Sequence, residues 1–232
     1  MSRRERTSTG AGGPEGTPSQ QRERAPKFPR HDPAAAAAAL SNHPVLGPMV
    51  RFAGPPELPD RGMDHFAMLL RSITFQQLAG KAALTIHGRV VDALGGAVTA
   101  PAVLAASDDA LRAAGLSANK LAAIRDLAAK AADGAIGLDD IDRADDDEAI
   151  ARLTSVRGIG VWTAQMFLMF QLQRPDVWPT GDLGVRAGWA KLHGEPEPPS
   201  ARELDLLGHG FRPFRTAVAW YCYRAVDMGV PE

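Results

Sequence analysis

The chain of 232 residues contains a single cysteine, Cys222, which excludes an internal disulfide and a four-cysteine zinc or iron–sulfur site. Only 6% of the residues are aromatic while alanine is abundant, which favours helices over a β-sandwich or barrel. No apolar run is long enough to cross a bilayer, and no apolar segment follows the first arginines as it would in a secretory signal. These absences predict an all-α protein without membrane segments, in a reducing, cytoplasmic compartment.

Net charge is also small, at −1, but it is unevenly distributed along the chain. Residues 1–30 hold seven Lys or Arg and three acids, whereas residues 133–148 hold eight acids and one arginine. The rest of the chain is therefore mildly basic, and the acidic segment offsets this charge in the overall sum. A local basic surface tests nucleic-acid binding better than the overall charge does, so the composition leaves DNA binding open.

The chain divides into a short tail and one larger domain. Residues 1–28 are polar, basic and poor in apolar residues, which predicts a disordered tail, and residues 29–232 form the domain. In the domain, Asp32-Pro33 is typical of a helix start, and residues 54–62 form a Pro/Gly-rich loop. Apolar spacing and capping residues predict helices over about 63–75, 79–94 and 118–132, short helices opened by Pro101 and Ser107, and a helix through Ile150 and Leu153.

Residues 153–164, with the sequence LTSVRGIGVWTA, are the most informative segment of the chain. A helix ends, a Gly-x-Gly turn follows, and a new apolar helix begins, so the segment predicts a helix-hairpin-helix at about 145–172. The backbone N–H groups of Gly158, Gly160 and Val161 are expected to face outward at a helix N-terminus, where they can bind a phosphate without any lysine.

This segment resembles the helix-hairpin-helix of DNA repair glycosylases, and further segments extend the resemblance in the same order. They include LRSITFQQLAGKA at 70–82, GLSANK at 115–120, PTGDLGVR at 179–186, and RPFRTA through WYCY at 212–223. Over residues 60–228 the chain resembles the 3-methyladenine DNA glycosylase II (AlkA-like) branch of the HhH-GPD superfamily, in its compact form without the N-terminal β domain. The resemblance implies a two-lobed, all-α fold.

Asp182 lies 22 residues after Gly160, where this family has its catalytic aspartate. A lone aspartate before a helix is more often an N-cap, and one carboxylate can fill both roles. The resemblance implies that Asp182 stabilises the oxocarbenium character that develops at C1′ and orients or deprotonates water.

The same resemblance implies a substrate pocket and a DNA-binding surface. The expected pocket residues are Trp162, Trp178, Trp220 and Tyr223, of which Trp178 and Tyr223 are favoured over core packing and Trp220 is not. Their aromatic faces suit an electron-poor alkylated base. Gln77 is expected near the position of the intercalating side chain, with a solvated helix residue as the equal alternative. The expected DNA-binding residues are Gln76, Gln77, Arg157, Gly158, Ile159, Gly160, Val161 and Thr163.

No cofactor is expected beyond a monovalent cation, Na or K, which the resemblance places on the main-chain carbonyls of Thr154, Val156 and Ile159. Bifunctional relatives carry a nucleophilic lysine two residues after the second hairpin glycine, where this chain has Trp162, so the reaction is expected to be hydrolytic. Arg157 replaces the family's usual proline, and Tyr223 and Phe214 replace usual tryptophans.

The resulting prediction is a monofunctional glycosylase that flips and removes alkylated purines from damaged duplex DNA, as a monomer, nucleoid-associated if bacterial. The alternatives are a glycosylase for another lesion, such as hypoxanthine, and a non-catalytic helix-hairpin-helix DNA-binding protein.

Overall fold

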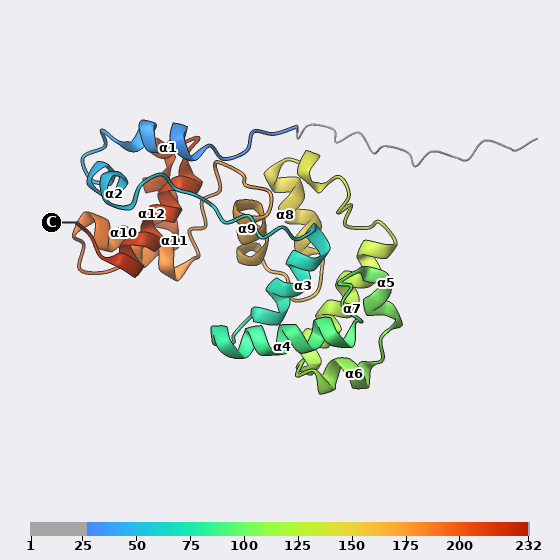
Figure 1. Cartoon of the computed structure of the whole chain (residues 1–232). Coiled ribbons are helices and arrows are strands. Elements are labelled where there is room, and N and C mark those ends of the chain that lie inside the picture. The colour runs from blue at the N-terminus through green and yellow to red at the C-terminus, as the bar shows by residue number, and fades with distance from the viewer. Residues whose placement is uncertain (1–26, 232) are drawn as a thin grey trace, which may run out of the picture.

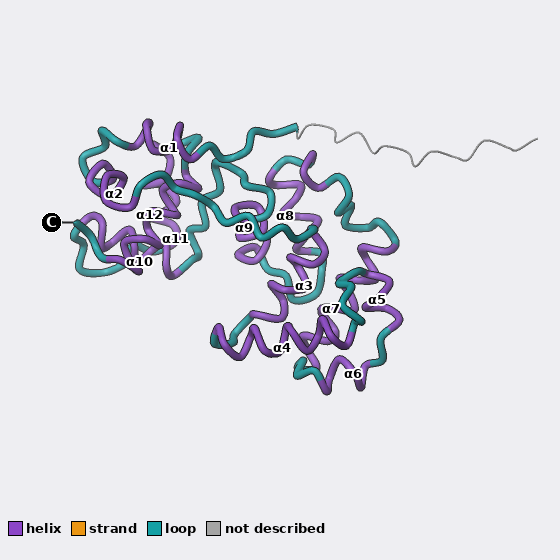
Figure 2. The backbone as a smooth tube through the Cα atoms, in the orientation of Figure 1, coloured by secondary structure: helices purple, strands orange, loops and turns teal. Residues whose placement is uncertain are grey.

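The computed structural model describes residues 27–231, and over this range it contains helices and no strands (Figure 2). Figure 1 shows two groups of helices joined by extended segments. The expected all-α, two-lobed architecture is therefore confirmed. None of the helices in this range is long and apolar enough to span a membrane. The predicted tail lies outside the described residues except for Lys27 and Phe28, and Phe28 belongs to the folded part because its ring lies 4.3 Å from the Arg174 guanidinium.

The first lobe is built from both ends of the described chain. Its elements are α1 (Pro33–Leu40), α2 (Leu46–Ala53), α10 (Leu183–His193), α11 (Ala201–Leu207), the 3-10 helix η2 (Gly208–Phe211) and α12 (Arg215–Met228). Helices α10 and α12 cross so closely that a Cβ on Gly188 would lie 2.0 Å from the Cys222 carbonyl oxygen. Glycine at 188 is therefore what allows α10 to reach its position.

The second lobe contains the middle of the chain (Figure 1). Its elements are α3 (His65–Phe75), α4 (Gly80–Ala93), α5 (Ala100–Ala105), α6 (Asp108–Ala113), α7 (Ala118–Ala132), the 3-10 helix η1 (Ile141–Arg143), α8 (Asp146–Thr154) and α9 (Val161–Phe170). Helix α3 buries Leu69, Leu70 and Ile73 completely, and α7 buries Ile124 and Leu127. These side chains recur at the three- and four-residue spacing from which the helices were predicted.

Several expected helix boundaries are confirmed by their caps. Asp32 accepts the N–H groups of Ala34 and Ala35 at the start of α1, and Ser107 caps α6. Helix α7 has the bounds predicted for it, whereas α2 and α11 were not predicted.

Candidate active site

The hairpin between α8 and α9 is a tight turn anchored by apolar side chains. Ile159 N–H donates to the Val156 carbonyl at 3.1 Å, and Gly158 between them has φ 78°. Val156 and Ile159 are 1% and 4% exposed, whereas Arg157 and Gly158 face solvent. The sequence therefore places the apolar residues of the turn in the core and the glycine backbone on the surface.

The N-terminus of α9 carries no side-chain cap, because Gly160 is its N-cap residue. Gly160 and Val161 are exposed beside it. The first N–H groups of an α-helix have no intrahelical partner, and the helix dipole adds a partial positive charge at this end. The N–H groups of such an exposed end can donate hydrogen bonds to an anionic oxygen. This is the arrangement expected from the Gly-x-Gly sequence.

Asp182 caps the next helix, α10, and joins the two lobes. Its Oδ1 accepts the Val185 N–H at 2.9 Å, and its Oδ2 accepts the Trp162 indole N–H at 2.5 Å. The side chain is 7% exposed, and Trp162 comes from α9 in the other lobe. The carboxylate is thus both the expected N-cap and a nearly buried charge at the lobe junction.

Tyr223 of α12 packs against this carboxylate across Gly184. A Cβ on Gly184 would lie 3.1 Å from both Asp182 Oδ1 and Tyr223 Cε1, so a larger residue would require the carboxylate or the ring to shift. Burial, reinforced by the charge of Asp182, raises the pKa of Tyr223 well above its ordinary value, and the same two causes raise the pKa of the buried Cys222 thiol. The Tyr223 phenol O–H donates to the Met166 sulfur at 3.7 Å.

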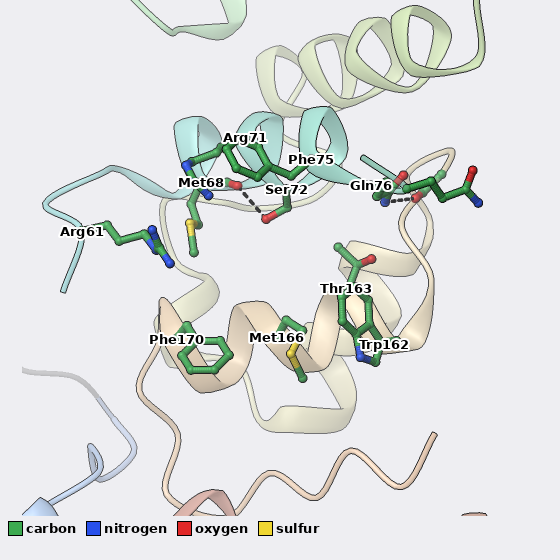
Figure 3. A pocket seen from close by; sticks show the side chains of 12 residues that line it. Arg61, Met68, Arg71, Ser72, Phe75, Gln76, Trp162, Thr163, Met166 and Phe170 are labelled. Carbon is green, nitrogen blue, oxygen red and sulfur yellow. Dashed lines mark hydrogen bonds between the residues drawn. The ribbon is translucent and has the colours of Figure 1, made fainter. Parts of the chain in front are cut away.

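A cavity of about 600 Å³ opens between α3 and α9 beside the hairpin (Figure 3). Trp162 belongs to its wall and also donates to Asp182, so the cavity and the carboxylate are neighbours. The volume lies within the range of pockets that hold small organic ligands. Its lining residues are Arg61, Met68, Arg71, Ser72, Phe75, Gln76, Gln77, Gly158, Trp162, Thr163, Met166 and Phe170.

The two glutamines at the end of α3 have different environments. The Gln76 side-chain amide donates to the Gly158 carbonyl at 2.9 Å and so supports the hairpin. This hydrogen bond makes Gln76 less available for contact with DNA than expected. Gln77 is exposed and has φ 56°, a conformation that costs free energy for residues other than glycine. Thr163, another expected DNA-binding residue, is buried and faces the cavity (Figure 3).

Two of the expected pocket aromatics lie elsewhere. Trp178 is 6% exposed, its indole N–H donates to the Leu204 carbonyl at 2.8 Å, and its ring packs edge-on against Trp189. It is therefore a core residue of the first lobe, contrary to the expectation from the sequence. Trp220 packs against Tyr221 and Arg224 and does not line the cavity. Of the expected set, Trp162 and Tyr223 interact with Asp182.

The sequence reasoning missed one wall of the cavity. Met68, Arg71 and Phe75 follow each other at three- and four-residue spacing along α3, and they line the cavity together. Met68 is nearly buried, whereas Arg71 and Phe75 are half-buried. The Arg71 guanidinium carbon lies 3.7 Å from the Phe75 ring centroid, and burial together with the charge of Arg61 lowers the pKa of Arg71. The helical spacing of these three residues was the sequence signal that could have identified this wall of the cavity.

Comparisons with known proteins agree with this geometry. Residues 70–209 match the model of the HhH-GPD superfamily base excision DNA repair proteins. DNA-3-methyladenine glycosylase 1 of Schizosaccharomyces pombe is 36% identical over 178 residues, which are 73% of this chain and 77% of that protein. The chain belongs to the HhH-GPD superfamily.

Solved structures point to one branch of that superfamily. The fission-yeast 3-methyladenine DNA glycosylase in complex with abasic DNA superposes with a TM-score of 0.74 at 30% identity, covering 85% of this chain and all of that one. A DNA-3-methyladenine glycosidase from Bacillus halodurans gives 0.76 at 32% identity, covering 85% and 90%. This chain is similar to 3-methyladenine glycosylases over both of its lobes.

Proposed function

We propose that this protein is a monofunctional DNA glycosylase that removes alkylated purines, of the 3-methyladenine and 7-methylguanine type, from damaged duplex DNA in base excision repair. The observation that carries the proposal is the nearly buried Asp182 carboxylate, held at the lobe junction beside a cavity and close to the uncapped N-terminus of α9. The protein acts as a monomer in the cytoplasm, associated with the nucleoid if it is bacterial.

DNA binding begins at the hairpin. The uncapped N-terminus of α9 and the exposed backbone of Gly158 and Gly160 bind phosphates of the lesion strand. Exposed Gln77, which lines the cavity, fills the space that the flipped nucleotide leaves. This role would explain why Gln77 has an unfavourable backbone conformation.

The flipped base enters the space bounded by aromatic side chains. Trp162 and Phe75 line the cavity, and Tyr223 packs beside Asp182. An alkylated purine is electron-poor or cationic, so these rings attract it, and its N-glycosidic bond is already weakened.

Asp182 acts on the sugar. As the bond between C1′ and the base nitrogen breaks, its electron pair leaves with the base and positive charge develops at C1′. The fixed carboxylate stabilises this charge, and a water molecule attacks C1′ while its proton passes to Asp182 or to solvent. Two N–H donors occupy Asp182, but a carboxylate has about four acceptor positions, so it retains capacity for this work.

The position of a possible nucleophilic lysine is occupied by Trp162, whose N–H holds the carboxylate instead. Hydrolysis without strand cleavage follows from this substitution. The hairpin carbonyls of Thr154, Val156 and Ile159 would hold a monovalent cation. Among the described residues neither the Thr154 nor the Ile159 carbonyl accepts a backbone hydrogen bond, whereas the Val156 carbonyl already accepts the Ile159 N–H and would share its oxygen with the ion. Such an ion would add a positive charge at the hairpin, beside the backbone N–H groups that we propose to bind phosphate. With one buried cysteine in the chain, an iron–sulfur cluster has no ligand set.

One observation favours a second substrate class. Arg61 and Arg71 both line the cavity, and neither forms an ion pair within residues 27–231. A guanidinium repels a cationic base but donates readily to a carbonyl oxygen such as that of hypoxanthine. Deaminated purines are therefore the second candidate substrate.

The test is base release from methylated and from hypoxanthine-containing duplex, by wild type and Asp182→Asn, with strand nicking followed in parallel. Asparagine preserves the cap of α10, and Asp32→Asn at the cap of α1 is the matched control. Wild type and Asp32→Asn should release methylated base without nicking, and Asp182→Asn should be slower by about 10²- to 10³-fold. Unchanged release by Asp182→Asn would contradict the mechanism, and release of hypoxanthine alone would select the second candidate.

A further inference from the structure

The hairpin is held in place by one face of α7. The Asp126 carboxylate Oδ2 accepts the backbone N–H of Arg157 at 2.7 Å and the Lys130 ammonium at 2.9 Å. The same ammonium donates to the Ser155 carbonyl at 2.5 Å. Asp126 and Lys130 lie one helical turn apart, so a single face of α7 holds the backbone of the turn at Ser155 and Arg157.

These bonds fix the orientation of two successive peptide groups. In a trans peptide the C=O and N–H point in opposite directions, so an N–H of Arg157 held toward Asp126 turns the Val156 carbonyl away from α7. That carbonyl accepts the Ile159 N–H and closes the turn. The Lys130 contact fixes the preceding peptide through the Ser155 carbonyl. The direction in which the Gly158 and Gly160 backbone faces is set by these two peptides.

The turn explains why an acceptor is needed at this point. With a hydrogen bond from Ile159 N to Val156 O and a positive φ at Gly158, Arg157 occupies the second position of a turn with the pattern of type II. Proline suits that position because it presets φ and carries no N–H. Arginine presets nothing and brings an N–H that Asp126 accepts.

We propose that Asp126, paired with Lys130, is a positioning residue for DNA binding, because it holds the Val156–Arg157 peptide in the orientation that a proline at 157 would impose without help. This inference rests on the proposed function of the hairpin as a phosphate-binding site. Asp126 does not itself contact DNA in this account.

Charge alone predicts the opposite effect, which makes the proposal testable. The Arg157 N–H, and secondly Lys130, lowers the pKa of Asp126, so the carboxylate is ionised at neutral pH. Removing an anion near a DNA-binding surface should strengthen binding through reduced repulsion from phosphates. Removing a positioning residue should weaken it.

The first experiment measures the Kd for an abasic-site duplex with Asp126→Ala and with Asp109→Ala, a charge-matched control on α6 whose side chain is exposed. Asp126→Ala should bind about tenfold more weakly, and Asp109→Ala equally or slightly more tightly. Asp126→Asn keeps an oxygen that accepts the Arg157 N–H and should retain most of the affinity. Equal tightening by both alanine variants, or a tenfold loss in Asp126→Asn, would overturn the proposal.

The second experiment repeats Asp126→Ala in an Arg157→Pro background. Arg157→Pro and the double variant Arg157→Pro/Asp126→Ala both lack the arginine side chain, so its contribution cancels in the comparison. Neither protein has an N–H at position 157 for Asp126 to accept. The tenfold effect should fall below about twofold. A loss of the same size in both backgrounds would show that Asp126 acts otherwise than through this N–H.

A third measurement separates this inference from the proposed function. The amide resonance of Arg157 should shift with the protonation of Asp126 in the protein without DNA, and the shift should vanish in Asp126→Ala. If the Arg157 amide resonance did not change with the protonation of Asp126, the positioning role would be refuted, even in an active glycosylase. A coupled amide in a wild-type protein that neither binds duplex nor releases base would refute the proposed function, and the DNA-binding role with it.

Discussion

Two helix N-termini face the proposed DNA site, and they are built in opposite ways. Helix α9 begins at exposed Gly160 and has no side-chain cap, whereas α10 begins at Asp182, whose carboxylate is nearly buried and accepts the Val185 N–H. We call the N-terminus of α9 the open end, because its N–H groups are free to bind an external anion. We call the N-terminus of α10 the closed end, because the Asp182 carboxylate already occupies it. The Trp162 N–H on Asp182 Oδ2 links the two ends.

In the proposed function, this difference divides the work of a glycosylase between two short segments. The open end suits the negatively charged DNA backbone and needs no side chain, so its sequence requirement is glycine. The closed end suits the positive charge that develops on the sugar and needs one carboxylate in one place. Changes at the first end should alter DNA affinity, and changes at the second should alter the rate of base release.

Closing the open end should have the largest effect. Nothing lies within 4 Å of a Cβ on Gly160, so Gly160→Asp would fit and would cap α9. We expect DNA affinity about 30-fold weaker, because a carboxylate would occupy the proposed phosphate site, and we expect the unfolding midpoint to be unchanged or higher. The neutral cap Gly160→Asn, measured by fluorescence anisotropy alongside it, should lose much less. Equal losses in the two variants would mean that steric change, not charge, sets the affinity.

Burial of Tyr221 in α12 of the first lobe also predicts alkaline instability. Burial raises the pKa of Tyr221 to about 12, so above pH 10 the unfolded chain loses this proton while the folded chain keeps it. The free energy of unfolding should therefore be unaffected below pH 9 and fall by about 2 kcal/mol toward pH 12. Urea titrations at several pH values measure this slope. Tyr221→Phe should reduce it, and an unchanged slope would assign the loss to Tyr223, Cys222 or other groups.

Crowding the closed end should slow the reaction without weakening the fold. A Cβ on Gly184 would lie 3.1 Å from Asp182 Oδ1 and from the Tyr223 ring, so Gly184→Ala requires the carboxylate or the ring to shift by a few tenths of an ångström. We expect base release about tenfold slower in single-turnover assays, with stability nearly unchanged because alanine favours the helix. Gly181→Ala, where nothing lies within 4 Å of the added Cβ, is the neighbouring control and should remain active.

Removing the link between the two ends should have the smallest effect. Trp162→Phe keeps an aromatic wall in the cavity but deletes the N–H that holds Asp182 Oδ2. We expect the single-turnover rate to fall about threefold and DNA affinity to stay the same. Trp220→Phe, outside the cavity, should change neither, and a large affinity loss in Trp162→Phe would show that the indole contributes to DNA binding.

The sequence predicted the elements whose signals are local. Caps at Asp32, Ser107 and Asp182 and the apolar spacing of α7 are all readable from neighbouring residues, and each is confirmed. Helix α2 was missed because Gly47 and Pro48 weaken its pattern, and α11 because it is short and follows a proline-rich segment.

Long-range contacts account for what the sequence could not predict. Nothing local to Trp178 shows that the Leu204 carbonyl and Gly208 surround its indole, so a core residue was taken for a pocket residue. The bond from the Arg157 N–H to Asp126 joins residues 31 apart, and the Gln76 bond to the hairpin joins residues 82 apart. Such contacts follow from the packing of α3 and α7 against the hairpin.

The division between the two helix ends is tested most directly by measuring, for Gly160→Asp and Asp182→Asn in parallel, the Kd for an abasic-site duplex and the single-turnover rate of base release at saturating enzyme. Gly160→Asp should weaken the Kd and leave the saturated rate within a few-fold of wild type. Asp182→Asn should leave the Kd intact and lower the rate by about 10²-fold or more. If both variants changed the same quantity by similar factors, the two ends would not divide the work and the account would be wrong.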